Sequence, residues 1–140
     1  MNIKKIEADF LKGLFSRLSH KYLMTEYKGR IGYTDGHYVA LVPNKDAFVK
    51  CDRNFVFEKI LYDRKERGRA DYTYTITAGA DNLARYERVD GQGYAYINVK
   101  YTRYFSQNAE YRVAGQKDFV TVYENDDLVG IIFPVNIKEE

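Results

Sequence analysis

Two histidines and one cysteine are the side chains of this sequence best suited to catalysis or to binding a transition metal. His20 and His37 do not form a metal-ligand spacing such as His-x-x-x-His, and Cys51 alone cannot build a structural zinc site. A lone cysteine is more often a small core residue than a nucleophile, and it excludes an internal disulfide, which fits a reducing compartment. These residues therefore predict no metal centre and no catalytic nucleophile.

The acidic residues that could act as acids, bases or ligands fall in turns. Asp35 could pair with His37, but an aspartate before a glycine is already explained by hairpin geometry. Asp126 and Asp127 are adjacent in a predicted turn, and a calcium loop needs more oxygen ligands at fixed spacing. No dinucleotide or nucleotide-phosphate loop occurs. The sequence predicts a protein that is not an enzyme and binds no cofactor.

Aromatic and basic residues alternate in two segments, Tyr72–Arg88 and Tyr94–Phe105. This pattern can form a stacking platform for single-stranded nucleic acid. The same alternation in a strand also places aromatic rings inside and charges outside without any function. Both interpretations remain open. The 14 tyrosines, against 8 phenylalanines and no tryptophan, suit half-buried strands.

Length and composition predict one domain spanning residues 1–140, with 45% hydrophobic residues to fill its core. The net charge of +2, from 22 basic and 20 acidic residues, is too even to indicate nucleic-acid binding by itself, although a local basic face is compatible with it. The sequence shows no uninterrupted apolar stretch of the kind expected for a signal peptide, and no apolar run of the ~20 residues that a membrane span needs. We therefore expect a cytoplasmic protein without a membrane partner.

Apolar residues at helical spacing predict an amphipathic helix over residues 3–21. The apolar side comprises Ile3, Ile6, Phe10, Leu11, Leu14, Phe15 and Leu18. The opposite side comprises Lys5, Asp9, Lys12, Ser16 and His20.

Alternating, β-rich runs predict the strands that follow. Asp35-Gly36 and Asp90-Gly91 each predict a hairpin turn, and residues 125–127 predict a third turn. Pro134 is expected to end the last strand or to place it at an edge. The expected strands cover residues 30–34, 38–42, 72–77, 83–89, 94–97, 110–113, 119–123 and 128–133.

Two further helices are predicted. Residues 44–71 form an inserted segment with a short helix near residues 55–61, and the charged run Asp63–Arg69 is interpreted as its solvated end, with a phosphate-binding patch as the alternative. Asn98 is expected to cap a helix over Val99–Gln107, with Lys100, Arg103 and Gln107 on its outer face. The fold class is therefore α+β, an antiparallel sheet with two helices on one face.

Three short motifs, in this order along the chain, resemble one known family. Residues 33–40 read Tyr-Thr-Asp-Gly-His-Tyr-Val-Ala, residues 97–101 read Ile-Asn-Val-Lys-Tyr, and residues 128–137 end in Phe-Pro-Val-Asn-Ile. They are similar to a hairpin, a strand-to-helix junction and the C-terminal strand of the bacterial DNA sliding clamp, the processivity subunit of the replicative polymerase. The resemblance is best over residues 94–137.

The resemblance implies a sliding-clamp-like domain with residues 44–71 as an insertion. Clamp helices direct basic residues at DNA phosphates without reading sequence, which implies double-stranded DNA as a partner. The matching DNA-binding residues are Lys5, Lys12, Lys100 and Arg103. The C-terminal strand gives Phe133, Pro134 and Val135 as partner-binding residues, with a replication protein as the partner. Because the chain has material for one clamp domain, a ring would require a homo-oligomer.

Two functions follow as hypotheses. The first is a clamp-like binding protein of a bacterial, phage or mobile-element cytoplasm that contacts DNA or replication proteins without catalysis. The alternative is a protein–protein adaptor or inhibitor with the same fold and no DNA role. The oligomeric mass in solution would help to distinguish them.

Overall fold

Nine strands form one antiparallel sheet in the computed structural model, which describes residues 1–15, 22–47, 55–61 and 65–137. The helices are α1 (Ile3–Leu14), α2 (Phe57–Leu61), α3 (Val99–Thr102) and the short 3₁₀ helix η2 (Asn44–Asp46). The strands are β1 (Leu23–Tyr27), β2 (Arg30–Thr34), β3 (Tyr38–Pro43), β4 (Gly68–Ala78), β5 (Asp81–Arg88), β6 (Tyr94–Asn98), β7 (Glu110–Val113), β8 (Val120–Glu124) and β9 (Asp127–Ile132). Their order across the sheet is β1-β2-β3-β9-β8-β7-β4-β5-β6.

The prediction of an α+β fold with an antiparallel sheet is confirmed. Hairpins join β2 to β3 and β5 to β6 at the two Asp-Gly pairs, where Gly36 and Gly91 have φ angles of 99° and 74°. Strand β1 and its turn to β2 were not predicted. That turn consists of Lys28 and Gly29, which have φ angles of 47° and 76°.

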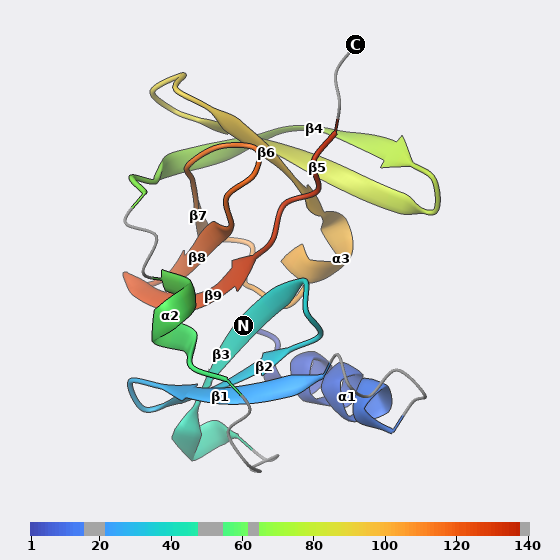
Figure 1. Cartoon of the computed structure of the whole chain (residues 1–140), viewed down its shortest axis with the longest axis vertical. Coiled ribbons are helices and arrows are strands. Elements are labelled where there is room, and N and C mark those ends of the chain that lie inside the picture. Colours follow the sequence, from blue (N-terminus) through green and yellow to red (C-terminus); the bar gives the residue numbers. More distant parts are fainter. Residues whose placement is uncertain (16–21, 48–54, 62–64, 138–140) are drawn as a thin grey trace.

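The sheet is joined in its middle by strands that are distant in sequence. Strand β3 pairs with β9 through Tyr38–Ile132, Val39–Ile131 and Ala40–Gly130. Gly130 is needed there, because a Cβ at this position would lie 2.5 Å from the carbonyl oxygen of Val39 and 2.6 Å from the Phe105 ring. Figure 1 shows β1–β3 at one end of the molecule, β4–β6 at the other, and β7–β9 between them.

Helices α1 and α3 share the main core on one face of the sheet. Ile6 and Phe10 of α1 are fully buried, and the Phe10 ring lies 4.9 Å from that of Tyr33. The Tyr38 ring lies 5.0 Å from Tyr101 in α3 and 4.9 Å from Tyr104. All of these side chains belong to one buried cluster.

Helix α2 covers the opposite face. Its Phe57 is fully buried in a second cluster with Val39, Leu41, Phe119 and Ile131. Since side chains alternate along a strand, β3 contributes Tyr38 and Ala40 to one core and Val39 and Leu41 to the other. The two helices predicted on one face correspond to α1 and α3, whereas the prediction assigned no face to the helix that is α2.

Two predicted helices are too long. Helix α1 ends at Leu14, before the predicted end at residue 21, and residues 16–21 lie outside the described part of the chain. Helix α3 ends at Thr102 instead of Gln107. The chain leaves the helix there in a tight turn, with the Phe105 amide donating to the Thr102 carbonyl, so that Tyr104 and Phe105 are buried in the main core.

The charged run at 63–69 was interpreted as a helix end with Gly68 as its last residue, but Gly68 begins β4 opposite Val113. A Cβ at Gly68 would lie 2.9 Å from Nε of Arg88, so glycine makes room for that arginine. Of the charged run at 63–69, residues 63 and 64 lie outside the described ranges, as do His20 and Cys51.

One edge of the sheet is open along β4. This strand pairs with β7 at Gly68, Arg69 and Ala70, whereas its pairing with β5 extends to Ala78. Residues 71–78 of β4 therefore have β5 on one side, and no strand within the described ranges pairs with their opposite side.

Candidate functional site

Two of the four predicted DNA-binding residues line a hollow of about 330 Å³ between α1 and α3, here called the helix hollow. Lys12 and Lys100 both line it, so the structure brings these two predicted residues together. Lys5 lies beside it and forms an ion pair with Asp9 at 3.2 Å. Arg103 is exposed at the end of α3 and does not line the hollow.

Two carboxylates share the helix hollow with the lysines. The Tyr104 hydroxyl donates to Asp9 Oδ2 at 2.8 Å, and the Tyr101 hydroxyl donates to Asp35 Oδ2 at 3.0 Å. Burial, followed by the nearby carboxylates, raises the pKa of both tyrosines, so both hydroxyls remain protonated donors at neutral pH. Asp9 and Asp35 therefore offset the charges of Lys12 and Lys100, and an incoming phosphate would face both signs.

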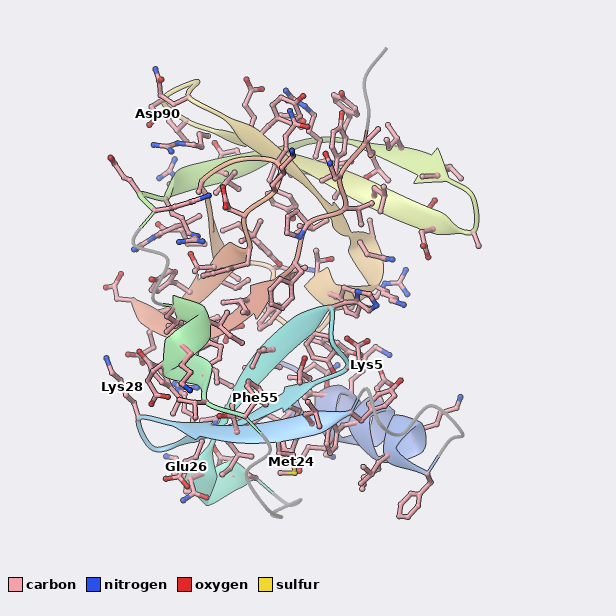
Figure 2. The ribbon with its side chains drawn as sticks, viewed as in Figure 1. Lys5, Met24, Glu26, Lys28, Phe55 and Asp90 are labelled. Carbon is pink, nitrogen blue, oxygen red and sulfur yellow. The ribbon has the colours of Figure 1, made fainter. Side chains whose placement is uncertain are left out.

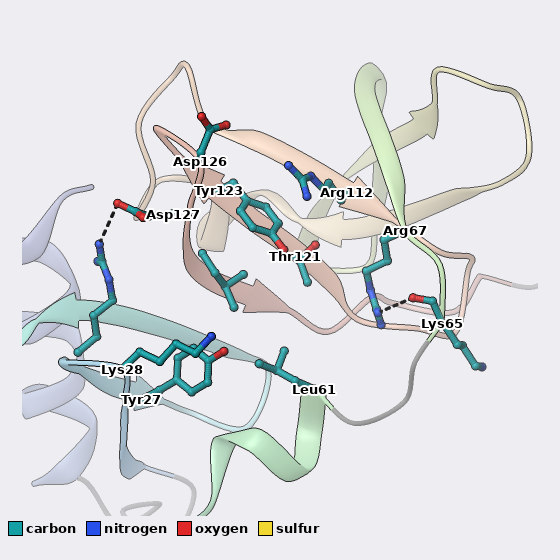
Figure 3. A pocket seen from close by; sticks show the side chains of 12 residues that line it. Tyr27, Lys28, Leu61, Lys65, Arg67, Arg112, Thr121, Tyr123, Asp126 and Asp127 are labelled. Atoms are coloured by element: carbon teal, nitrogen blue, oxygen red, sulfur yellow. Dashed lines mark hydrogen bonds and ion pairs between the residues drawn. The ribbon is translucent and has the colours of Figure 1, made fainter.

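A larger hollow of about 630 Å³ lies elsewhere on the molecule and is here called the basic pocket (Figure 3). The cationic residues that line it are Lys28, Arg30, Lys65, Arg67 and Arg112, and the acidic ones are Asp126 and Asp127. Figure 2 shows Lys5, beside the helix hollow, and Lys28, in the basic pocket, on opposite sides of the view.

Backbone geometry explains how strands and turns assemble the basic pocket. Lys28 adopts a left-handed conformation in the β1–β2 turn, and Arg30 begins β2. Arg112 in β7 lies directly opposite Thr121 in β8, so both side chains are on the same sheet face. Tyr123 shares this face because it is two residues from Thr121.

Several cations of the basic pocket are held in place by neighbouring groups. The Arg112 guanidinium lies 3.9 Å from the centre of the Tyr123 ring, and its Nε donates to Glu110 at 2.5 Å. The Arg67 guanidinium lies 3.8 Å from the centre of the Phe119 ring, and its Nε donates to the Phe119 carbonyl at 2.8 Å. Because these arginines are ordered before a ligand arrives, binding costs less conformational entropy.

Lys65 and Arg30 each form an ion pair with an aspartate at the pocket. Lys65 Nζ lies 2.7 Å from Asp118 Oδ1, and Arg30 Nη2 lies 3.8 Å from Asp127 Oδ2. Asp127 is exposed, so the second of these contacts is weak.

Thr121 gives the basic pocket an unusual polar group. Its side chain is 5% exposed, and its hydroxyl has no hydrogen-bond partner within the described part of the structure. A buried hydroxyl without a partner costs about 1–3 kcal/mol. An anion in the pocket would accept this hydrogen bond and remove that cost only if the side chains that cover the hydroxyl moved aside, because the oxygen is fully buried.

The predicted partner-binding residues do not form one surface. Phe133 packs on Phe119 at 6.2 Å between ring centres and lines an apolar hollow of about 190 Å³ next to Phe55 and Ile60. Val135 is 40% exposed and lies beside β6, where its amide donates to the Tyr96 carbonyl. Pro134, between them, is half-buried and does not line that hollow.

Most of the basic pocket was not predicted from the sequence, because its cations come from separate segments of the chain. The charged run was the one signal, since its alternative interpretation was a phosphate-binding patch, and Lys65 and Arg67 from this run line the pocket. Nothing local marked Lys28, Arg30 or Arg112 as their neighbours.

Comparison with protein-family models, with curated proteins and with solved structures gives no match to this chain. No helix in the described ranges is both long enough and apolar enough to cross a membrane. The same residues contain no group of three or more His, Cys, Asp or Glu side chains that could hold a metal ion.

Proposed function

We propose that this protein is a non-catalytic binding protein for nucleic acid, and that the phosphates of the nucleic acid bind in the basic pocket. The observation that carries the proposal is the pocket itself, which is lined by five cations, two carboxylates and Thr121, whose hydroxyl has no partner among the described residues. Arginines that are already ordered suit phosphate oxygens, because each guanidinium offers several donors in a fixed plane.

The proposal keeps the function class that the sliding-clamp resemblance implies and changes the contact surface. Phosphate contacts made by Lys and Arg do not read sequence, and they release counterions, so affinity falls as salt rises. The helix hollow remains the competing surface. It is lined by two lysines and two carboxylates, whereas the basic pocket is lined by five cations and two carboxylates. Glu110 and Asp118 pair with Arg112 and Lys65 of the pocket, so its arginines, two of them held in place, are the feature that favours it over the helix hollow.

Two matched double variants distinguish these surfaces. Lys28→Asn with Arg112→Gln removes two charges from the basic pocket, and asparagine tolerates the left-handed backbone at position 28. Lys100→Ala with Arg103→Ala removes two charges from α3. We expect the pocket variant to flatten the slope of log affinity against log salt by roughly 1–2 units, and the α3 variant to leave it unchanged. Fluorescence anisotropy with labelled oligonucleotides measures both slopes.

The opposite result, a flatter slope for the α3 variant alone, would place the phosphate contacts on the helices, as in a clamp. If the parent protein does not bind oligonucleotides at low salt, the nucleic-acid proposal is wrong.

A protein–protein adaptor is the second candidate, favoured by the apolar hollow that Phe133 lines. Such a hollow fits an apolar side chain of a peptide. Peptides selected from a random library on the parent protein should then carry an apolar anchor residue and should lose binding to the Phe133→Ser variant. Equal binding to both proteins would reject this site.

A further inference from the structure

The sheet face that carries the basic pocket continues across four strands. Residues directly opposite each other in an antiparallel pair share a face, as do residues two apart in one strand. From the pocket outward, this face carries Arg112, Arg69, Asp71, Glu87, Arg85 and Tyr96. A register shift between Tyr72 and Tyr74 places Tyr74 opposite Arg85, and therefore on this face.

Tyr74, Arg85 and Tyr94 form a platform on this face, here called the tyrosine platform. The Arg85 guanidinium lies 4.2 Å from the centre of the Tyr94 ring and 5.7 Å from that of Tyr74. Arg85 is also held by Glu87, to which it donates at 2.8 Å. The platform thus contains a planar cation between two aromatic rings, with little freedom to move.

Tyr74 is the exposed member of the platform. Its side chain is 46% exposed, although its hydroxyl already shares a hydrogen bond of 3.0 Å with the Tyr96 hydroxyl. The polar end of Tyr74 is therefore satisfied within the protein, while the residue as a whole remains exposed. Exposed aromatic rings beside arginine provide the stacking surface on which single-strand-binding proteins hold bases.

We propose that the nucleic acid is single-stranded, with its phosphates in the basic pocket and one or more bases stacked on the tyrosine platform. The proposal rests on the proposed function, because the pocket must hold phosphates. Bases in a duplex stack on one another, whereas those of a single strand are free to stack on protein rings. Arg69, opposite Arg112, and Tyr74 are five residues apart in β4, which corresponds to about 15 Å along the strand. This length suits a short single-stranded segment.

The test uses a labelled oligothymidine of about 12 nucleotides, within the site sizes of known single-strand-binding folds, and an abasic strand of equal length. Tyr74→Ala should weaken binding of the oligothymidine about 5- to 150-fold and leave binding of the abasic strand unchanged. Tyr74→Phe should retain the parent's affinity, because it keeps the ring. Tyr72→Ala is the matched control, since Tyr72 is also exposed but lies on the other sheet face.

The outcomes separate the two proposals. If the parent binds the oligothymidine and the abasic strand with equal affinity, base stacking is overturned and the phosphate site remains supported. An equal loss of oligothymidine affinity in the Tyr72→Ala and Tyr74→Ala variants has the same meaning. If the parent binds neither strand, both proposals are overturned. Tyr74→Ile, which retains β propensity, replaces Tyr74→Ala if the alanine variant does not fold.

Discussion

Burial determines the chemistry of the tyrosines beneath α1 and α3. Burial raises the pKa of Tyr38, Tyr101 and Tyr104, and the carboxylates of Asp9 and Asp35 raise these pKa values further. Burial also raises the pKa of Tyr111 on β7. All four hydroxyls therefore remain neutral at pH values where an exposed tyrosine ionises.

This difference predicts a loss of stability in alkali. The folded-state pKa values lie above the unfolded value of about 10, so this stabilisation is fully present below pH 10 and is lost as the pH rises further. A titration that records tyrosinate absorbance should show one group of tyrosines ionising near pH 10 and a later group ionising with the loss of circular dichroism. Tyr101→Phe should reduce the later group. Ionisation of all tyrosines in a single step near pH 10 would contradict the prediction.

Thr121 provides a second prediction for a single residue. Thr121→Val removes the unpartnered hydroxyl and should raise the free energy of unfolding by about 1 kcal/mol, while weakening oligonucleotide binding. Thr25→Val is the control, because the buried Thr25 hydroxyl donates to the Phe55 carbonyl at 2.8 Å. Removing this hydrogen bond should lower the free energy of unfolding by about 1 kcal/mol. Urea unfolding measures both changes. A loss of stability in Thr121→Val would show that its hydroxyl is satisfied in solution.

Among the elements, those with strong local signals were predicted correctly. The Asp-Gly turns were found because the residues at those positions favour the required backbone angles. Strand β1 was missed because the Lys28-Gly29 turn lacks the usual asparagine or aspartate. Helix α3 was predicted too long because burial of Tyr104 and Phe105 turns the chain after one helical turn, and this tertiary effect overrides local spacing.

Gly130 provides a prediction for strand β9. Gly130→Ala should lower the free energy of unfolding by about 1–3 kcal/mol or more, because the new methyl group would contact the Val39 carbonyl and the Phe105 ring. Gly115→Ala should change it little, since the nearest atom to a Cβ there is Asp118 Oδ2 at 3.7 Å. Chemical unfolding of both variants measures the difference. Equal stability would mean that β9 shifts to accept the methyl group.

At the scale of the whole molecule, the candidate site could be predicted only in part. The sequence supplied the charged run with Lys65 and Arg67, and it indicated the alternating aromatic and basic residues of β4–β6. It could not show that Arg112 lies near Lys28, because that proximity depends on the order of strands in the sheet. The balanced net charge of +2 also gave no sign that five cations line one pocket.

The open edge of β4 predicts self-association. Residues 72–77 are uncharged and rich in tyrosine and threonine, and unprotected edges of this kind pair with other strands. Light scattering at high concentration should detect dimers, and Thr75→Lys should reduce them because a charged edge resists pairing. Asn108→Lys adds the same charge on an exposed turn and should leave dimers intact. A parent protein that is monomeric at every concentration would contradict the prediction that the β4 edge mediates self-association.

The position of β9 also constrains how the protein is made. Strand β9 lies between β3 and β8 in the sheet, yet the ribosome synthesises it after both of them. At an elongation rate of about 5–20 residues per second, the edge of β3 at residues 38–40 waits on the order of ten seconds for its partner, residues 130–132. The nascent chain thus carries an apolar strand with one unpaired edge through most of its translation, and a ribosome that stalls before residue 128 releases a product prone to aggregate.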